Sequence, residues 1–182
     1  MLHWPESMAS YLVEDKILIS NDIFGQHFAT SERFDDEVDD FGELMFQSKK
    51  YYANIFLPVS KPVQKFLDKL KQKEWEFDLL APDHGVIWRK NIARCFEDYN
   101  LWAYGETKKK AIVVYDTMWE STAKMARAVA EGLSGDGVSV KVYDLRYNHR
   151  SDIVVDLLDA KAVLIGSSVL NSEILPKLAD ML

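Results

Sequence analysis

The strongest constraint on the fold is a regular alternation of strand and helix patterns in the C-terminal part of the chain. Short apolar runs predict three strands, at residues 111–115, 138–143 and 162–165. Helices are expected between them, over residues 122–133 and after Ser151, which is a good N-cap. The order strand–helix–strand–helix–strand is typical of an α/β fold with a parallel, doubly wound sheet.

The preceding part of the chain shows a less regular pattern. A short strand is expected at residues 16–20 and another at residues 77–80. Between them, Ser60 starts a helix whose apolar positions recur every three or four residues. Because the pattern changes near residue 107, we predict a domain boundary that separates residues 1–107 from residues 108–182.

Composition excludes several classes of protein. Of 182 residues, 48% are hydrophobic and 12% aromatic, which is enough to build a core and argues against a disordered chain. The formal net charge of −7 argues against nucleic acid as a partner. No apolar run approaches the ~20 residues that span a bilayer, so no membrane partner is expected. The start of the chain lacks an export signal and there is one cysteine, Cys95, so a cytoplasmic location is expected.

One candidate binding loop follows the first strand of the C-terminal part. It carries the hydroxyl residues Thr117, Ser121 and Thr122 at the start of a helix. Hydroxyl groups and backbone N–H groups at a helix N-terminus suit a phosphate monoester, although simple helix capping explains the same residues. Trp119 in this loop can stack on a planar ring or pack against the protein. A triphosphate-binding glycine loop is absent from the sequence.

A second set of candidates carries metal-ligand chemistry. His3, Asp22 and His84 are predicted to lie in loops, and two of them follow short strands. Imidazole and carboxylate groups are the usual ligands of zinc and of non-haem iron. Histidines in loops are also common without a metal, so the residues alone leave both readings open. His27 is expected to be structural and His149 exposed.

Four strings, in this order, resemble motifs of the flavodiiron proteins, also called A-type flavoproteins. They are residues 1–8 (MLHWPESM), 20–27 (SNDIFGQH), 82–89 (PDHGVIWR) and 115–122 (YDTMWEST). That family fuses a metallo-β-lactamase-like diiron domain to a flavodoxin-like domain. The resemblance therefore implies the C-terminal part of an αββα domain in residues 1–107. It implies the N-terminal half of a flavodoxin-like, FMN-binding sheet in residues 108–182.

The resemblance also assigns roles to single residues. His3 would ligate one iron, His84 the other, and Asp22 would bridge the two, because a carboxylate has two oxygens. Thr117, Ser121 and Thr122 would hold the phosphate of FMN. The remaining flavin contacts would come from Met118, Trp119, Ser167, Leu170 and Asn171.

The sequence also departs from the family pattern. The upstream His-x-Glu-x-Asp-His motif is absent, as are the last two strands of a flavodoxin-like sheet. We therefore expect an internal piece of a longer protein with an incomplete diiron site. Ser168 departs from the usual second flavin loop. Glu120 places a carboxylate beside the phosphate site, which is unfavourable unless it points to solvent.

For the parent protein, the resemblance implies an oxidoreductase that reduces dioxygen to water or nitric oxide to nitrous oxide. It would use FMN and two non-haem iron ions, accept electrons from a rubredoxin-like donor, and form a head-to-tail homodimer. One alternative is an FMN-binding electron-transfer module without a metal site. Others are a zinc hydrolase and an inactive fragment.

Overall fold

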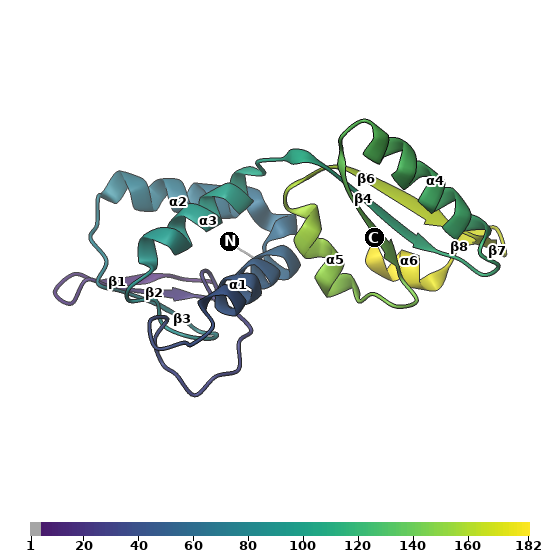
Figure 1. Cartoon of the computed structure of the whole chain (residues 1–182). Coiled ribbons are helices and arrows are strands. Elements are labelled where there is room, and N and C mark those ends of the chain that lie inside the picture. Colours follow the sequence, from purple (N-terminus) through teal and green to yellow (C-terminus); the bar gives the residue numbers. More distant parts are fainter. Residues whose placement is uncertain (1–4) are drawn as a thin grey trace. The chain divides into compact units, whose positions relative to one another are not determined.

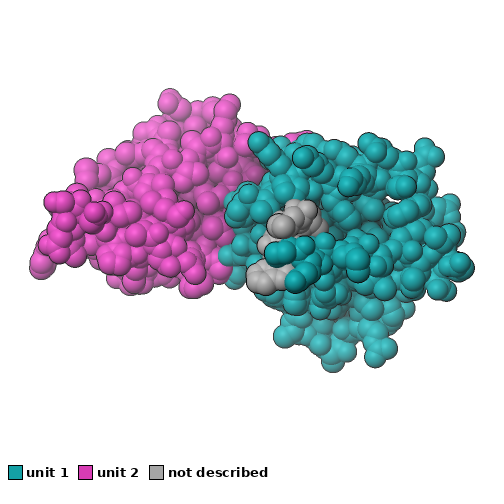
Figure 2. Space-filling view, turned by 180° about the vertical axis from the view of Figure 1, so that it is seen from behind, with its two compact units in different colours: residues 1–105 teal, residues 106–182 magenta. Residues whose placement is uncertain are grey.

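The structure is a computed structural model, and it describes residues 5–182 of the chain. The chain divides into two compact units, Met1–Gly105 and Glu106–Leu182, which Figure 2 shows in different colours. This division lies two residues from the change in sequence pattern near residue 107. Each unit has its own sheet and its own core.

The first unit combines a small sheet with three helices. Its elements are β1 (Ser10–Leu12), β2 (Ile17–Asn21), α1 (Phe41–Ile55), a 3-10 turn (Leu57–Val59), α2 (Ser60–Lys73), β3 (Leu79–Pro82) and α3 (Ile92–Tyr104). The strands lie in the order β1-β2-β3; β1 is antiparallel to β2, and β2 is parallel to β3. The parallel pairing brings the carboxyl ends of β2 and β3 to the same edge, with Asn21 opposite Pro82.

Aromatic side chains fill the core of the first unit. Phe24, Tyr52, Trp88 and Tyr99 are fully buried. The Phe24 ring lies 4.6 Å from that of Tyr99, in the tilted packing that aromatic pairs favour. The helix predicted from Ser60 is confirmed as α2, and its apolar stripe is buried at Val63, Leu67 and Leu70.

The second unit is the regular part of the chain. Its elements are β4 (Lys108–Asp116), α4 (Ser121–Gly135), β5 (Ser139–Asp144), α5 (Arg150–Leu157), β6 (Ala160–Ser167), β7 (Val169–Leu170), β8 (Glu173–Ile174) and α6 (Pro176–Met181). The strands lie in the order β5-β4-β6, and β4 is parallel to both neighbours. The predicted α/β fold with a parallel sheet is therefore confirmed.

Helices cover both faces of this sheet (Figure 1). On one face, Ile112 and Val114 of β4 pack with residues of α5 and α6, including Ile153 and Leu178. On the other face, Val113 and Tyr115 pack with α4 through small alanine side chains. Because β4 is buried on both faces, its sequence reads as a continuous apolar run.

The buried face of α4 differs from the sequence interpretation. The spacing places Met125, Val129 and Leu133 on one face, but Met125 is 60% exposed and Val129 40% exposed. The residues that contact the sheet are Ala123 and Ala126. Small side chains let a helix backbone approach a sheet closely, so the contact face carries little hydrophobic signal in the sequence.

The acidic segment at residues 32–43 combines a helix start with one buried carboxylate. Asp40 caps α1 by accepting a hydrogen bond from the backbone N–H of Glu43. Asp35, by contrast, is only 1% exposed and accepts hydrogen bonds from the backbone N–H groups of residues 89–91. No helix within residues 5–182 is long and apolar enough to cross a membrane.

Candidate functional sites

The first candidate site lies where the parallel strands β2 and β3 end. Asp22 follows β2 and His84 follows β3, and their side chains meet with His84 Nε2 3.0 Å from Asp22 Oδ1. The two residues are 62 positions apart in sequence, and the strand pairing brings them together. Asp22 is largely shielded, with 18% of its side chain exposed, whereas His84 is 46% exposed. An accessible imidazole beside a shielded carboxylate can serve as two ligands of one metal ion.

The loop that carries Asp22 is held in a defined conformation. Asn21 and Phe24 both have left-handed backbone angles, with φ of 58° and 71°. Such angles are costly for residues with a side chain, so packing must hold them in place. Phe24 is fully buried, and its carbonyl accepts a hydrogen bond from Trp88 Nε1 at 2.8 Å. The carboxylate of Asp22 is thus presented by a backbone that has little freedom to move.

A buried glutamine joins this loop to the loop that carries His84. Gln26 is fully buried; its backbone N–H donates to the carbonyl of His84, and its side-chain oxygen accepts from the N–H of Val86. Gly85 lies directly against it with φ of +82°. A Cβ at Gly85 would lie 1.8 Å from Gln26 Oε1, so only glycine fits here.

Aromatic rings surround the pair on one side. The His27 ring packs edge-on against Tyr51 at 4.8 Å and lies 5.6 Å from the His84 ring. The Tyr51 hydroxyl lies 3.5 Å from Asp22 Oδ1. Burial raises the pKa of Tyr51, and the nearby Asp22 carboxylate raises it further, so the phenol stays protonated. His27 therefore takes part in packing beside the site, in keeping with its expected structural role.

The other expected metal ligand, His3, lies outside the described residues. Within residues 5–182, no group of three or more His, Cys, Asp or Glu side chains is arranged to hold a metal ion. Of the three expected ligands, the described part of the chain brings Asp22 and His84 together.

The second candidate site lies where the parallel strands β4 and β6 end. The loop after β4 enters α4 at Ser121, so the first N–H groups of a 15-residue helix face this region. The Thr117 side chain is 4% exposed, and its hydroxyl has no hydrogen-bond partner among the described residues. A buried hydroxyl without a partner is costly, and a bound acceptor such as a phosphate oxygen would satisfy it.

Ser168, after β6, ties the two loops of this site together. Its hydroxyl accepts a hydrogen bond from the N–H of Met118 at 3.3 Å and lies 3.2 Å from Thr122 Oγ1. The backbone N–H of Ser168 also donates to the carbonyl of Asp116. In the sequence, Ser168 stands out only as a departure from the family motif. Its contacts give it a structural role, because it fixes the hydroxyl-rich loop against its neighbour.

Glu120 does not leave an unbalanced charge beside the loop. Its backbone is left-handed, with φ of 63°, and its carboxylate accepts a hydrogen bond from Arg146 Nη1 at 2.6 Å. Arg146 is also paired with Asp144. This ion pair offsets the negative charge that the sequence places next to the candidate phosphate site.

The remaining predicted flavin residues lie around the same loops. Trp119 is 86% exposed, and Leu170 is 45% exposed. Ser167 ends β6, and its hydroxyl accepts a hydrogen bond from the N–H of Leu175. Asn171 lies at the turn of the β7–β8 hairpin with φ of 51°. The indole of Trp119 and the side chain of Leu170 are therefore accessible to a ligand.

Comparison with known proteins identifies the relatives of this chain. A family model for flavodoxin matches residues 113–182. The whole chain is 48% identical to a nitric oxide reductase of Moorella thermoacetica and 38% identical to an anaerobic nitric oxide reductase flavorubredoxin of Vibrio vulnificus. Among solved structures, the rubredoxin oxygen:oxidoreductase of Desulfovibrio gigas matches all of the chain, with 39% identity and a TM-score of 0.93.

The resemblance to the flavodiiron proteins is confirmed over the whole chain. The crystal structure of the flavodiiron protein from Giardia intestinalis matches 99% of it, with a TM-score of 0.89 and 34% identity. The chain spans about half the length of the relatives it matches: it covers 45% of the Moorella protein and 45% of the Desulfovibrio structure. The flavodoxin-like fold of the second unit agrees with both kinds of comparison.

Proposed function

We propose that this chain is part of an oxidoreductase of the flavodiiron type, which reduces dioxygen to water or nitric oxide to nitrous oxide. The observation that carries the proposal is the buried Thr117 hydroxyl without a partner, at a helix start, in a chain similar throughout to flavodiiron proteins. Bound FMN takes up electrons singly or in pairs, and two ferrous ions can together bind and reduce a small diatomic molecule.

In this proposal the second unit binds FMN. Thr117, Ser121 and Thr122 hold the phosphate, with help from the free N–H groups at the start of α4. Met118 and Trp119 contribute backbone and ring contacts. The β6 end and the hairpin, through Ser167, Leu170 and Asn171, lie along the flavin.

The first unit contributes to the iron centre. His84 Nε2 and the oxygens of Asp22 are proposed as iron ligands, with the carboxylate bridging and His3 as a third ligand. The rigid loop and the Gln26 bridge hold Asp22 and His84 in position before metal binding, which lowers the cost of assembling the site. For the whole protein, we also propose further iron ligands, a rubredoxin-like electron donor and a head-to-tail homodimer.

FMN binding is tested by titrating the full chain into FMN and following flavin fluorescence. Thr117→Val removes the hydroxyl but keeps the shape of the side chain, and we expect it to weaken FMN binding about tenfold. Thr107→Val, at an exposed position before β4, is the matched control and should bind as the wild type does. Equal affinity of all three proteins would refute the assignment of the phosphate site.

Metal binding is tested separately, by adding ferrous iron to the full chain without oxygen and measuring retained iron. We expect His84→Ala to retain less iron than the wild type, with His149→Ala as control because His149 caps α5 in the other unit. The second candidate function, an FMN-binding electron-transfer module without metal, is favoured by the two-residue donor set within residues 5–182. FMN binding with no iron retention in the wild type would support that alternative.

A further inference from the structure

The residue that begins α4 is unusual for the start of a helix. Glu120 is the N-cap of α4, but its backbone is left-handed, with φ of 63° and ψ of 0°, and its side chain makes no capping hydrogen bond. N-cap residues are usually extended, and a short polar side chain binds the first N–H groups of the helix. Left-handed angles are costly for a residue with a side chain, so a contact elsewhere must hold Glu120 in place.

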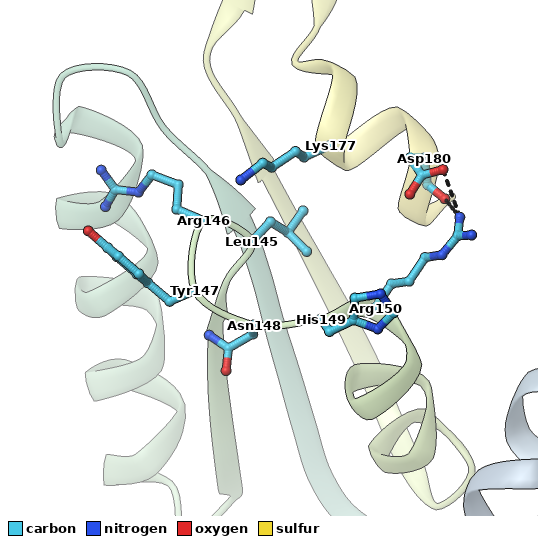
Figure 3. A pocket seen from close by; sticks show the side chains of 8 residues that line it. All are labelled: Leu145, Arg146, Tyr147, Asn148, His149, Arg150, Lys177 and Asp180. Atoms are coloured by element: carbon cyan, nitrogen blue, oxygen red, sulfur yellow. Dashed lines mark hydrogen bonds and ion pairs between the residues drawn. The ribbon is translucent and has the colours of Figure 1, made fainter. Parts of the chain in front are cut away.

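Arg146, in the loop after β5, makes the contact that holds the Glu120 side chain. Its Nη1 donates to Glu120 Oε1 at 2.6 Å, and Figure 3 shows the Arg146 side chain extending toward the start of α4. Its Nε and Nη2 donate to the two carboxylate oxygens of Asp144, at 3.0 and 2.6 Å, and this two-point contact fixes the plane of the guanidinium. Asp144, at the end of β5, therefore orients Arg146, and Arg146 in turn holds Glu120.

The same contact determines where the negative charge of Glu120 lies. Glu120 directly precedes Ser121 and Thr122, two of the residues proposed to hold the phosphate of FMN. A phosphate monoester carries about two negative charges at pH 7, so a carboxylate free to turn toward it would repel it. While Glu120 is bound to Arg146, its charge is paired, and the N–H groups at the start of α4 remain open to the phosphate.

We propose that Arg146 is a positioning residue that sets the preference of this site for FMN over riboflavin, the flavin without the phosphate. It acts through Glu120, by holding the carboxylate away from the phosphate and by keeping the left-handed turn that exposes the N–H groups of α4. The inference rests on the proposed FMN site. It adds that an ion pair from the end of β5, outside the hydroxyl loop, controls the affinity of that loop for phosphate.

The test compares the binding of FMN and of riboflavin to the full chain, measured by the change in flavin fluorescence. The two flavins differ only in the phosphate, so repulsion from a released carboxylate weakens the binding of FMN alone. We expect Arg146→Gln to weaken FMN binding about fivefold at low salt, as for the loss of one exposed ion pair, and to leave riboflavin binding unchanged. In about 0.5 M salt the loss for FMN should fall below about twofold, because salt screens exposed charges.

Two further variants separate the Glu120 contact from a general loss of positive charge. Arg150→Gln is the matched control: it removes the same charge nearby, but Arg150 is paired with Asp180 of α6, as the dashed contact in Figure 3 shows. It should bind FMN as the wild type does. The double variant Arg146→Gln/Glu120→Gly should bind FMN within about twofold of the wild type, because glycine has no charge and adopts left-handed angles without strain.

The results distinguish the role of Arg146 from the FMN site itself. Equal FMN affinities for Arg146→Gln and Arg150→Gln would overturn the role of Arg146. An equal loss of FMN and riboflavin binding in Arg146→Gln would overturn it too, because that result indicates general damage to the site and not repulsion of the phosphate. If the wild type binds neither flavin, or binds riboflavin as tightly as FMN, the proposed phosphate site is wrong and this inference fails with it.

Discussion

Replacement of Lys110 by methionine should destabilise the second unit by about 2 kcal/mol. Lys110 lies on the central strand β4 and is only 9% exposed. Its Nζ donates to Asp156 at 2.6 Å and to Asp159 at 2.7 Å, which ties β4 to the end of α5 and the turn before β6. Methionine has a similar length and volume, so the substitution removes the charge without opening a large cavity.

The expected loss of stability depends on which partners Asp156 and Asp159 keep when Lys110 is replaced. Removing one partner of a fully buried ion pair costs about 3–5 kcal/mol. Here Asp156 retains Lys141 at 2.8 Å and the Tyr143 hydroxyl, and Asp159 retains the exposed Lys108. The remaining partners reduce the cost, so about 2 kcal/mol is expected for Lys110→Met.

The same network predicts how the effect depends on pH. Burial alone would raise the pKa of Asp156, but hydrogen bonds from Lys110, Lys141 and Tyr143 outweigh it and lower the pKa to about 2. A carboxyl group whose pKa is lowered by folding stabilises the fold above its unfolded pKa, near 4. The stability advantage of the wild type over Lys110→Met should therefore shrink as the pH falls from about 4 to about 2.

Hydrogen exchange at the amides of residues 111–115 measures the result. These amides lie in the buried strand, and 2 kcal/mol corresponds to exchange about 30-fold faster at pH 7. Lys141→Met is the matched control: it contacts the same Asp156, but its side chain is 53% exposed, and its loss should cost less than about 1 kcal/mol. Equal exchange rates in the two variants would show that burial of Lys110 does not strengthen the network.

Two further predictions concern the first unit. Asp35→Ala should cost about 3 kcal/mol, because it leaves the backbone N–H groups of residues 89–91 without their acceptor. Asp36→Ala, which loses an ion pair with the exposed Arg89, should cost less than about 1 kcal/mol; urea unfolding measures both. Gly85→Ala should destabilise the unit by more than Gly105→Ala, because the new Cβ would collide with Gln26 at Gly85 but meet nothing within 4 Å at Gly105. Both glycines have left-handed φ, so equal melting temperatures for the two variants would refute the role assigned to the Gln26 contact.

The second unit could be predicted well from sequence because its strands are buried on both faces. Such strands appear as uninterrupted apolar runs, as at Ile112 and its neighbours in β4. The packing face of α4 could not be predicted in the same way. Ala123 and Ala126 contact the sheet, while the more hydrophobic Met125 is 60% exposed. Hydrophobicity alone therefore indicated the wrong face of this helix.

The first unit was less predictable because its core depends on contacts between distant segments. The helix at residues 92–104 is not among the expected elements, although α3 buries Cys95 and Tyr99. Asp35 lies in the acidic segment at residues 32–43, and it is buried because N–H groups more than 50 positions away bind it. The residues next to Asp35 in the sequence give no indication of these distant partners.

Both candidate sites arise from one structural rule. Asp22 and His84 follow the neighbouring parallel strands β2 and β3, and Thr117 and Ser168 follow the neighbouring parallel strands β4 and β6. Parallel pairing places the carboxyl ends of two strands at the same edge of the sheet. Residues 50 or more positions apart therefore meet there as a consequence of the strand pairing alone. This explains why the sequence could indicate which loops form the sites.

The residues that fix the geometry of these sites follow no such rule. Gln26 binds the His84 loop, Ser168 binds the Thr117 loop, and Arg146 neutralises Glu120, and each contact depends on a side chain reaching across to another segment. Such bridging residues hold the loops of the site in position, and they do not change which groups bind the ligand. Ser168→Ala should therefore weaken FMN binding while Thr117 and Thr122 remain in place, and Ser168→Thr, which keeps the hydroxyl, should restore it. If Ser168→Ala binds FMN as the wild type does, the phosphate loop does not need this bridge to hold its conformation.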